Sequence, residues 1–524
     1  MRSDYDAIIV GTGINSLACA VHLGAKGWRV GVFEQADIPG GAVKTLELTE
    51  PGFLHDWAAM NLSLLAGSAF FKAYGEDLTA RGLEFAPVSH CFASVFDDGK
   101  WFGVSTGPGE TRARIAAFSE ADAKAWDRLC EEFPGTAEYV FALLGSPMQM
   151  HIQGRLLAKA LYRKGFAWTV ELMRMLISSP RTFLTQTFES DHVRATLAAW
   201  GMHLDFAPDM AGGAVFPYLE SMANQQFGMV IGKGGAGTVT RALISRIEAS
   251  GGEIHCGQRV AKVLRKDGKA SGIALQDGSE IKASRAVIAN VAPSGLMDLL
   301  EGASGDGDFD GKMRKFSHAP GTMMIHLALD GLPDWTAGEE LKQFAYVHIA
   351  PSLDQMARTY QQAKAGLLPD EPVLVVGQPT VIDPSRAPEG KHVLWVQVRM
   401  VPGEITGDAA GEIAETDWAV VKDLYAERAL GIIERHAPGF KSKIRSRAIV
   451  SPLDLQADNP NLVGGDQIAG SHHLSQNFLF RPALGHATGK TPVDRLHLTG
   501  ASVWPGAGTG AGSGYMLAQK LGGK

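Results

Sequence analysis

The chain has 524 residues, of which 45% are hydrophobic, so it is long enough for two domains with a large buried core. The formal net charge is -7, and no run of lysine and arginine interleaves with aromatic residues, which excludes a typical nucleic-acid partner. The 4 cysteines are far apart without zinc-site or disulfide spacing, so we expect no metal site and a reducing compartment.

No stretch reaches the roughly 18 to 20 uninterrupted apolar residues of a membrane-spanning helix. The first residues, MRSDYDAIIVGTG, run directly into a predicted strand without the apolar segment of a signal peptide. We therefore expect a cytoplasmic protein.

The first predicted unit is a strand, a tight turn and a helix. An apolar, β-branched run at 5–10 ends in Gly11-Thr-Gly13 and continues into apolar residues at helical spacing. A second apolar strand at 29–33 then ends at Glu34, about 20 residues beyond the glycines. This is the pattern of a Rossmann-type βαβ unit, and the alternative is an ordinary glycine-rich turn.

The turn has the chemistry of a dinucleotide site. Gly11 and Gly13 let backbone N–H groups, including those of Ile14 and Asn15, approach a pyrophosphate at the positive end of the helix. Glu34 is expected to accept hydrogen bonds from ribose hydroxyls, and its charge disfavours a 2′-phosphate.

The segment after Glu34 favours FAD over NAD. It reads Glu34-Gln35-Ala-Asp-Ile-Pro-Gly40-Gly41-Ala42, with two adjacent glycines that an NAD site does not need. In flavoproteins of the glutathione-reductase type, such a pair lets the chain pass close to the diphosphate and the flavin. We therefore predict an FAD-binding unit.

A second glycine-rich turn, Gly232-Lys-Gly-Gly-Ala-Gly237, precedes a predicted helix and the strands of 253–289. It has two interpretations: a separate NAD(P)H site, or another part of the FAD domain. No acidic residue follows at Rossmann spacing after an equally clean strand, so we favour the second interpretation.

The C-terminal segment repeats the combination of strand, glycine-rich turn and helix. The predicted strand at 491–499 leads into a turn whose candidate cofactor-binding residues are Gly500, Ala501, Pro505, Gly508, Thr509 and Gly510. A following helix points N–H groups at the flavin N1/O2 edge, where negative charge develops on reduction.

These segments resemble the phytoene desaturase and carotenoid isomerase superfamily, with the Gly52-Phe53-Leu-His55-Asp56 stretch as a further match. The similarity covers essentially the whole chain and is strongest to the phytoene dehydrogenase-like branch, which includes pyridine nucleotide-disulfide oxidoreductase domain-containing proteins. One departure is Trp504 before Pro-Gly-Ala-Gly, where the family commonly has histidine before Pro-Gly-Gly-Gly. The family's substrate therefore does not carry over.

The resemblance implies an α/β fold, with a Rossmann-type, glutathione-reductase/amine-oxidase-like FAD domain and an inserted α+β substrate domain. We expect the FAD domain at 1–65, 230–300 and 485–524, with the backbone around Val260 beside the adenine. The substrate domain takes 66–229, a helical cap, and 301–484, a mixed sheet with strand-like runs such as 322–329. Residues 302–311 are expected to form an exposed loop.

The expected activity is FAD-dependent dehydrogenation or desaturation of a hydrophobic small molecule, with hydride transfer to flavin N5. The electron acceptor is oxygen, a quinone or a carrier protein. Three alternatives stay open: a flavin-dependent isomerase, an amine oxidase, and a flavoprotein with mainly a binding or assembly role. The fold alone does not decide among them.

The candidates for contact with substrate are His55, Asp56, Trp504 and Tyr515, each with a purely structural role as its alternative. Trp504 is expected to line the pocket, and a lone histidine in an apolar strand, His326, is more typical of a core residue. The stretch 149–187 mixes basic with apolar residues. This pattern has two interpretations: a peripheral contact with a membrane, or a helical cap over the substrate channel. The oligomeric state stays open.

Overall fold

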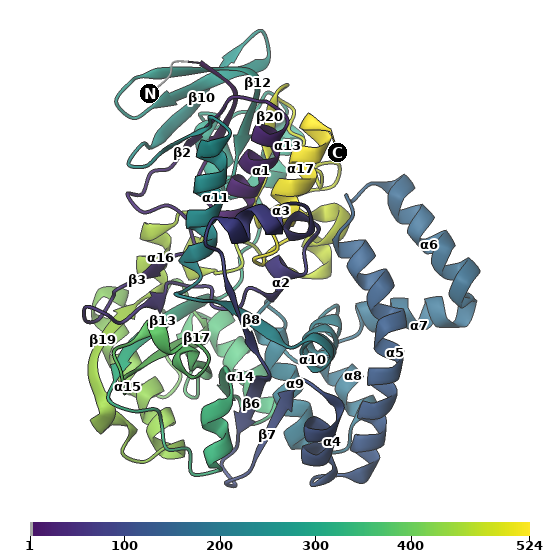
Figure 1. Cartoon of the computed structure of the whole chain (residues 1–524), viewed down its shortest axis with the longest axis vertical. Helices are drawn as coiled ribbons and strands as arrows, with labels where there is room; N and C mark the ends of the chain where they lie inside the picture. Colours follow the sequence, from purple (N-terminus) through teal and green to yellow (C-terminus); the bar gives the residue numbers. More distant parts are fainter. Residues whose placement is uncertain (1–3, 524) are drawn as a thin grey trace.

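The computed structural model describes residues 4–523, and two seven-stranded sheets organise it (Figure 1). In the first sheet, β20, β12, β1, β2 and β9 run parallel, and the antiparallel strands β10 and β11 extend it. Its strands are β1 (Asp4–Val10), β2 (Val30–Phe33), β9 (Glu253–His255), β10 (Val260–Lys266), β11 (Lys269–Leu275), β12 (Glu280–Ala289) and β20 (Leu496–Leu498).

Both faces of β1 are buried, as its continuous apolar run requires. Ala7 and Ile9 pack against three helices of one layer, α1 (Ile14–Ala25), α11 (Gly237–Ala249) and α17 (Gly512–Gly522). Ile8 packs on the opposite side with α12 (Pro293–Leu299). The Rossmann-type unit predicted from the sequence is therefore confirmed, with strands and helix in the expected places.

The second sheet is mixed and has the order β19-β13-β17-β16-β14-β6-β7. Its strands are β6 (His90–Val95), β7 (Trp101–Ser105), β13 (Gly321–Leu329), β14 (Tyr346–Ile349), β16 (Val373–Gly377), β17 (His392–Val401) and β19 (Ile444–Val450). Met323, Ile325 and Leu327 pack against α15 (Trp418–His436) on one face. Residues between these, such as Met324 on β13 and Trp395 on β17, point to the other face, in one cluster with the helices of residues 120–227.

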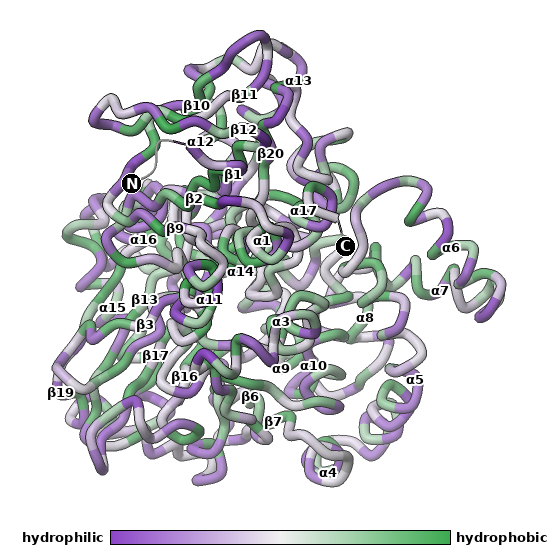
Figure 2. Tube along the Cα trace, turned by 45° about the horizontal axis from the view of Figure 1, so that its top comes forward, coloured by the Kyte–Doolittle hydropathy of each residue, from purple (hydrophilic) through white to green (hydrophobic). Residues whose placement is uncertain are grey.

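Helices dominate the segment between β7 and β8, whereas β6 and β7, also within the predicted helical cap of 66–229, belong to the second sheet. The helices are α4 (Pro108–Ala116), α5 (Glu120–Leu144), α6 (Met150–Lys164), α7 (Phe166–Ile177), α8 (Pro180–Thr187), α9 (Asp191–Met202) and α10 (Val215–Phe227). Figure 1 shows α6 and α7 projecting from the body of the molecule. Figure 2 shows hydrophobic and hydrophilic stretches alternating along the same two helices.

The shorter elements connect these layers. They are β3 (Thr45–Leu46), β4 (His55–Asp56), α2 (Ser63–Ala66), α3 (Ala69–Ala80), β5 (Phe85–Val88), β8 (Met229–Gly232), α13 (Gly307–Arg314), α14 (Leu353–Lys364), β15 (Leu367–Leu368), β18 (Gly407–Asp408) and α16 (Pro452–Asp458). The α13 helix corrects the expected loop at 302–311. Asp306 accepts hydrogen bonds from the Asp308 and Phe309 amides and so starts a helix in a glycine-rich stretch.

Candidate active site

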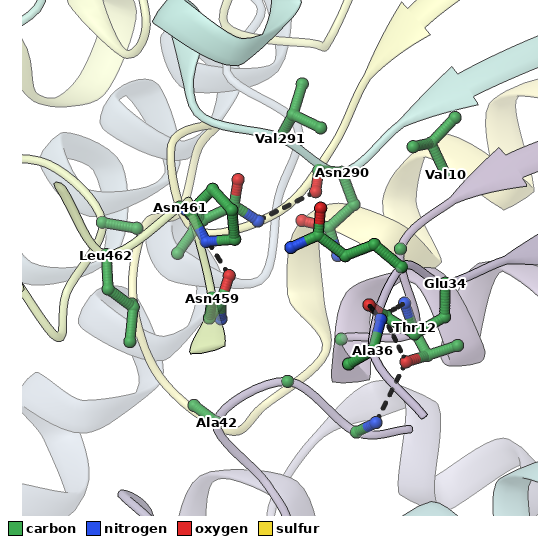
Figure 3. A pocket seen from close by; sticks show the side chains of 18 of the residues that line it. Val10, Thr12, Glu34, Ala36, Ala42, Asn290, Val291, Asn459, Asn461 and Leu462 are labelled. Atoms are coloured by element: carbon green, nitrogen blue, oxygen red, sulfur yellow. Dashed lines mark hydrogen bonds between the residues drawn. The ribbon is translucent and has the colours of Figure 1, made fainter. Parts of the chain in front are cut away.

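A pocket of about 640 Å³ lies where β1, β2 and β12 end, the edge of a parallel sheet at which nucleotides bind. This volume is in the usual range for a cofactor site. Figure 3 shows its lining from close by. The lining comes mainly from residues 10–15, 33–44, 259–261, 290–299, 458–469 and 501–509.

The N-terminal glycines shape the first wall of the pocket. Gly11 has a left-handed φ of +87°, and its N–H donates to the Phe33 carbonyl at 2.7 Å, which fixes the turn between β1 and α1. Gly13 directly precedes α1, and a Cβ at Gly13 would lie 3.0 Å from Asn290 Nδ2. The uncovered start of α1, with Ile14 and Asn15 also in the lining, favours an anionic phosphate.

The Glu34 carboxylate is held in the pocket by its neighbours. It accepts hydrogen bonds from Thr12 N at 2.8 Å, Thr12 Oγ1 at 2.6 Å and Ala36 N at 3.0 Å (Figure 3). Thr12 Oγ1 in turn accepts from Gly40 N at 3.0 Å. A carboxylate has about four acceptor positions, so Glu34 keeps capacity for ribose hydroxyls.

The adjacent glycines Gly40 and Gly41 lie close to the turn between β1 and α1. A Cβ at Gly40 would lie 2.5 Å from the Val43 carbonyl, and one at Gly41 would lie 3.4 Å from Gly13 Cα. Both have positive φ, and Ala42 continues the same wall. Gln35 and Val260, also predicted from the sequence, line the pocket as well.

Another wall of the pocket comes from the end of α16 and the loop that follows it. Asn461 Nδ2 donates to the Asn290 carbonyl at 3.0 Å, and its Oδ1 accepts from Ala292 N at 2.7 Å. Lys44 Nζ contacts the Asp458 carboxylate at 2.6 Å and 2.8 Å, joining this loop to the double-glycine segment. Sequence reasoning missed these residues as site residues. No local motif marks them, because they reach the pocket only through the packing of segments that are distant along the chain.

The C-terminal turn completes the pocket in part. Ala501, Gly508 and Thr509 line it, whereas Gly500, Pro505 and Gly510 do not belong to its lining. Ser513 and Asn15 hold the turn against α1. Ser513 Oγ accepts from Gly500 N at 3.0 Å, and Asn15 Oδ1 accepts from Ser513 Oγ at 3.0 Å and from Gly514 N at 3.2 Å.

His55 and Asp56 lie outside the pocket lining, in the short strand β4. The Asp56 carboxylate forms a buried ion pair with Arg386 and accepts from Ala236 N at 2.7 Å. His55 Nε2 lies 2.8 Å from Thr49 Oγ1, and burial lowers the pKa of His55 to about 4, so its ring is neutral at pH 7. Asp56 and Arg386 support the second glycine turn, because Arg386 also donates to the Gly232 carbonyl at 2.7 Å.

Trp504 and Tyr515 lie outside the pocket lining. The Trp504 indole N–H donates to the Ser146 carbonyl at 2.9 Å, and its ring stacks on Phe478 at 5.3 Å. The Tyr515 ring packs edge-on against His22 at 5.3 Å, because this side of α17 covers α1. Two neighbours of Trp504 along the chain, at 502 and 507, line the pocket instead.

The residues present fit FAD. The pocket combines a helix N-terminus for the pyrophosphate, an acid for the ribose, and glycines at which added Cβ atoms would crowd neighbouring atoms. When bound, the flavin supplies the redox chemistry by accepting electrons from the substrate.

A Rossmann-type sheet with this pocket at its carboxyl edge, beside a second mixed sheet, defines an FAD-dependent oxidoreductase. The model of the family described as flavin containing amine oxidoreductase matches residues 17–425, which is more than half of the chain. The protein belongs to that family.

Curated relatives match along nearly the whole chain. Pyridine nucleotide-disulfide oxidoreductase domain-containing protein 2 of Rattus norvegicus is 26% identical over 98% of this chain and 92% of its own length. The neurosporene-forming phytoene desaturase of Rhodobacter capsulatus is 25% identical over 98% and 93%. A solved oxidoreductase from Methanosarcina mazei shares the fold, with a TM-score of 0.62 at 19% identity over 98% and 99% of the two chains. The resemblance stated from the sequence is confirmed.

Proposed function

We propose that the protein dehydrogenates or desaturates a small, largely hydrophobic molecule and passes the electrons to oxygen, a quinone or a carrier protein. The observation that carries the proposal is the pocket, whose walls combine the N-terminal βαβ unit with the C-terminal turn. The phytoene desaturase relatives support a hydrophobic substrate. Desaturation removes two hydrogens from the substrate, so a proton must also leave.

The contacts of the predicted catalytic residues favour positioning over proton transfer. Asp56 already pairs with Arg386, and Trp395 Nε1 donates to the Asp56 carbonyl at 2.8 Å, linking β4 to the second sheet. Direct contact of His55, Asp56, Trp504 or Tyr515 with substrate stays a prediction.

The first experiment is an absorption spectrum of the purified protein before and after denaturation. We expect the two bands of oxidised flavin and an FAD chromophore. Anaerobic addition of polyenes, alcohols, cyclic ketones and amines then identifies the compound that bleaches the flavin. A colourless protein that does not bind added FAD contradicts the proposal. Turnover without net oxidation supports an isomerase, and a flavin that exchanges no electrons supports a binding role.

We further propose that α6 and α7 contact an anionic membrane surface peripherally. Residues 150–177 carry five basic residues and one acidic residue, against the net charge of -7 for the whole chain. Their exposed apolar residues are Met150, Leu157, Leu161, Tyr162, Phe166, Val170, Met173 and Ile177. This combination is typical of an interfacial helix. Among residues 4–523, no helix is long and apolar enough to cross a membrane.

A further inference from the structure

One face of the second sheet carries an unusual concentration of buried polar groups. His348 on β14 and Gln397 on β17 lie in one row across Val375, and Arg399 follows on the same face. The end of α9 covers this face. The rings of Trp200 and His203 lie 5.5 Å and 5.4 Å from the His348 ring. We call these five residues the polar cluster.

Each member of the polar cluster has a buried polar atom that makes no hydrogen bond within residues 4–523. The atoms are Trp200 Nε1, His203 Nε2, His348 Nδ1 and Nε2, Gln397 Oε1 and Arg399 Nε. An unpaired buried polar group costs about 1–3 kcal/mol, so such groups are rare in native proteins. Buried groups of this kind are normally paired by ordered water or by a bound ligand, so their concentration in one place makes this a candidate ligand site.

Arg399 gives the polar cluster a positive charge. Its guanidinium donates to neutral acceptors: the Met202 and His203 carbonyls at 3.1 Å and 2.6 Å, Thr322 Oγ1 at 3.2 Å and Gln467 Oε1 at 3.3 Å. Burial lowers the pKa of Arg399 to about 10, so it stays charged at neutral pH.

Two carboxylates, Asp205 and Asp466, lie near enough to Arg399 to offset part of this lowering of its pKa, but their direct contacts are with other groups. Asp205 Oδ1 accepts from Tyr360 at 2.9 Å, whereas Asp205 Oδ2 lies 3.1 Å from His473 Nε2 and makes no hydrogen bond within residues 4–523. Asp466 accepts from Gly470 N at 2.6 Å. In the part of the chain that the structure describes, Arg399 forms no direct ion pair with an acidic side chain.

The polar cluster adjoins the cofactor pocket through Gln467, which lines that pocket. Gln467 Oε1 accepts from Gln397 Nε2 at 2.9 Å and from Arg399. Gln397 Nε2 also approaches the carbonyl of Ala58, another lining residue, at 3.4 Å. Only the Gln467 side chain therefore separates a molecule bound at the polar cluster from the cofactor pocket.

We propose that the polar cluster binds a carboxylate of the substrate, so that the substrate is an acid with an apolar skeleton. This assignment rests on the proposed function. Two of the unpaired atoms, Trp200 Nε1 and Arg399 Nε, only donate, whereas Gln397 Oε1 only accepts. His203 and His348 are neutral because burial lowers their pKa, in His348 to about 3, so each ring has one N–H and one acceptor nitrogen. Both nitrogens of His348 are unpaired, so its N–H is available to a ligand. Carboxylate oxygens accept from such donors, and a pure hydrocarbon leaves them unpaired.

Matched ligand pairs test the assignment on the FAD-containing protein. Octanoate, 3-phenylpropanoate and cyclohexanecarboxylate are each titrated beside the corresponding alcohol, with tryptophan fluorescence and calorimetry as readouts. We expect at least one acid to bind at least tenfold more tightly than its alcohol. If every alcohol binds as tightly as its acid, the assignment is wrong.

Two variants locate the site. Arg399→Gln should weaken binding of the acid at least tenfold and of the alcohol little, and Trp200→Phe should weaken the acid about threefold to tenfold. Arg428→Gln and Trp418→Phe are matched controls, because both residues lie on α15 behind the opposite face of the sheet. FAD content and melting temperature show whether each variant folds. If Arg399→Gln fails to fold, the affinity of Trp200→Phe for the acid is compared with that of Trp418→Phe, and a loss in Trp200→Phe alone supports the assignment.

The assignment and the proposed function fail in different ways. If a neutral compound bleaches the flavin equally fast in the parent protein and in Arg399→Gln, the assignment is overturned and the function stands. If acids bind in an Arg399-dependent way but no compound reduces the flavin, the carboxylate site stands and the oxidoreductase proposal falls.

Discussion

Thr12 connects two parts of the cofactor pocket through one hydroxyl group. The hydroxyl donates to Glu34 and accepts from the Gly40 amide. In Thr12→Val, Glu34 loses one of its orienting bonds and the Gly40 amide loses its acceptor. We expect FAD affinity to fall about 5-fold to 30-fold, which corresponds to about 1–2 kcal/mol. Titration of the FAD-free protein measures this change.

The matched control is Thr359→Val. The Thr359 hydroxyl is also buried and donates to the Glu371 carbonyl at 2.8 Å, but it lies on α14. This variant should lose stability without losing FAD affinity. Equal losses of affinity in the two variants contradict the role given to Thr12.

Glu220 predicts a pH dependence of stability. It lies on α10, and burial raises the pKa of its carboxyl from 4.5 to about 7 in the folded protein. The folded state therefore holds this proton more tightly than the unfolded state. The stability that the group contributes is complete below about pH 4.5 and is lost as the pH rises to about 7.

A Glu220→Gln variant removes this titration. The parent should lose stability between pH 5 and pH 8, and the variant should not. The stability of the variant relative to the parent should therefore rise by roughly 2 kcal/mol over this range, since one pKa unit corresponds to about 1.4 kcal/mol. Urea unfolding at the two pH values gives this difference. A difference that does not change with pH contradicts the prediction.

Local spacing explains which pocket residues the sequence predicts. Gly11, Gly13 and Glu34 belong to one continuous βαβ unit, so their separation along the chain fixes their separation in space. Asn461 and Asp458 reach the pocket from more than 400 residues away, and such a contact depends on the packing of whole layers. The direction of Tyr515 is likewise set by the contact between α17 and α1, which periodicity does not reveal.

At the scale of elements, α6 and α7 combine an exposed apolar surface with positive charge. A double variant, Arg155→Glu and Arg163→Glu, should reduce co-sedimentation with anionic vesicles at least tenfold, because each basic residue near such a surface contributes about 1 kcal/mol. FAD content should stay unchanged, since neither residue lines the cofactor pocket.

The control for α6 and α7 has the same change of charge elsewhere on the surface. Lys266 and Lys315 are exposed and lie outside these helices. Vesicle binding by Lys266→Glu with Lys315→Glu should match that of the parent. If the parent protein does not bind anionic vesicles, the membrane proposal is wrong.

Element boundaries were predictable where the apolar pattern was continuous. The run at 322–329 became β13, because a strand buried on both faces needs apolar residues throughout. The expected loop at 302–311 contains the start of α13 instead. The glycines of this segment disfavour a helix, but the hydrogen bonds that Asp306 accepts stabilise its start. Helix propensity alone does not show which of the two effects is larger.

At the scale of the molecule, FAD should stabilise the whole fold, because the pocket is built from the beginning, the middle and the end of the chain. The melting temperature of the FAD-free protein should rise with added FAD, and about 4 kcal/mol of stabilisation is expected at 1,000 times the dissociation constant. Scanning fluorimetry at increasing FAD concentrations measures this. NADPH at the same concentrations serves as the control, because Glu34 disfavours a 2′-phosphate.

The pairing of β12 with β20 also affects how the protein is made. Ribosomes add about 5–20 residues per second, so the C-terminal strand follows β1 only after on the order of a minute. Until then the nascent chain exposes the edge of an incomplete sheet, and the cofactor has only part of its binding walls. Cofactor loading therefore belongs to the period after synthesis, and a chaperone that shields this edge should increase the yield of the flavin-containing form.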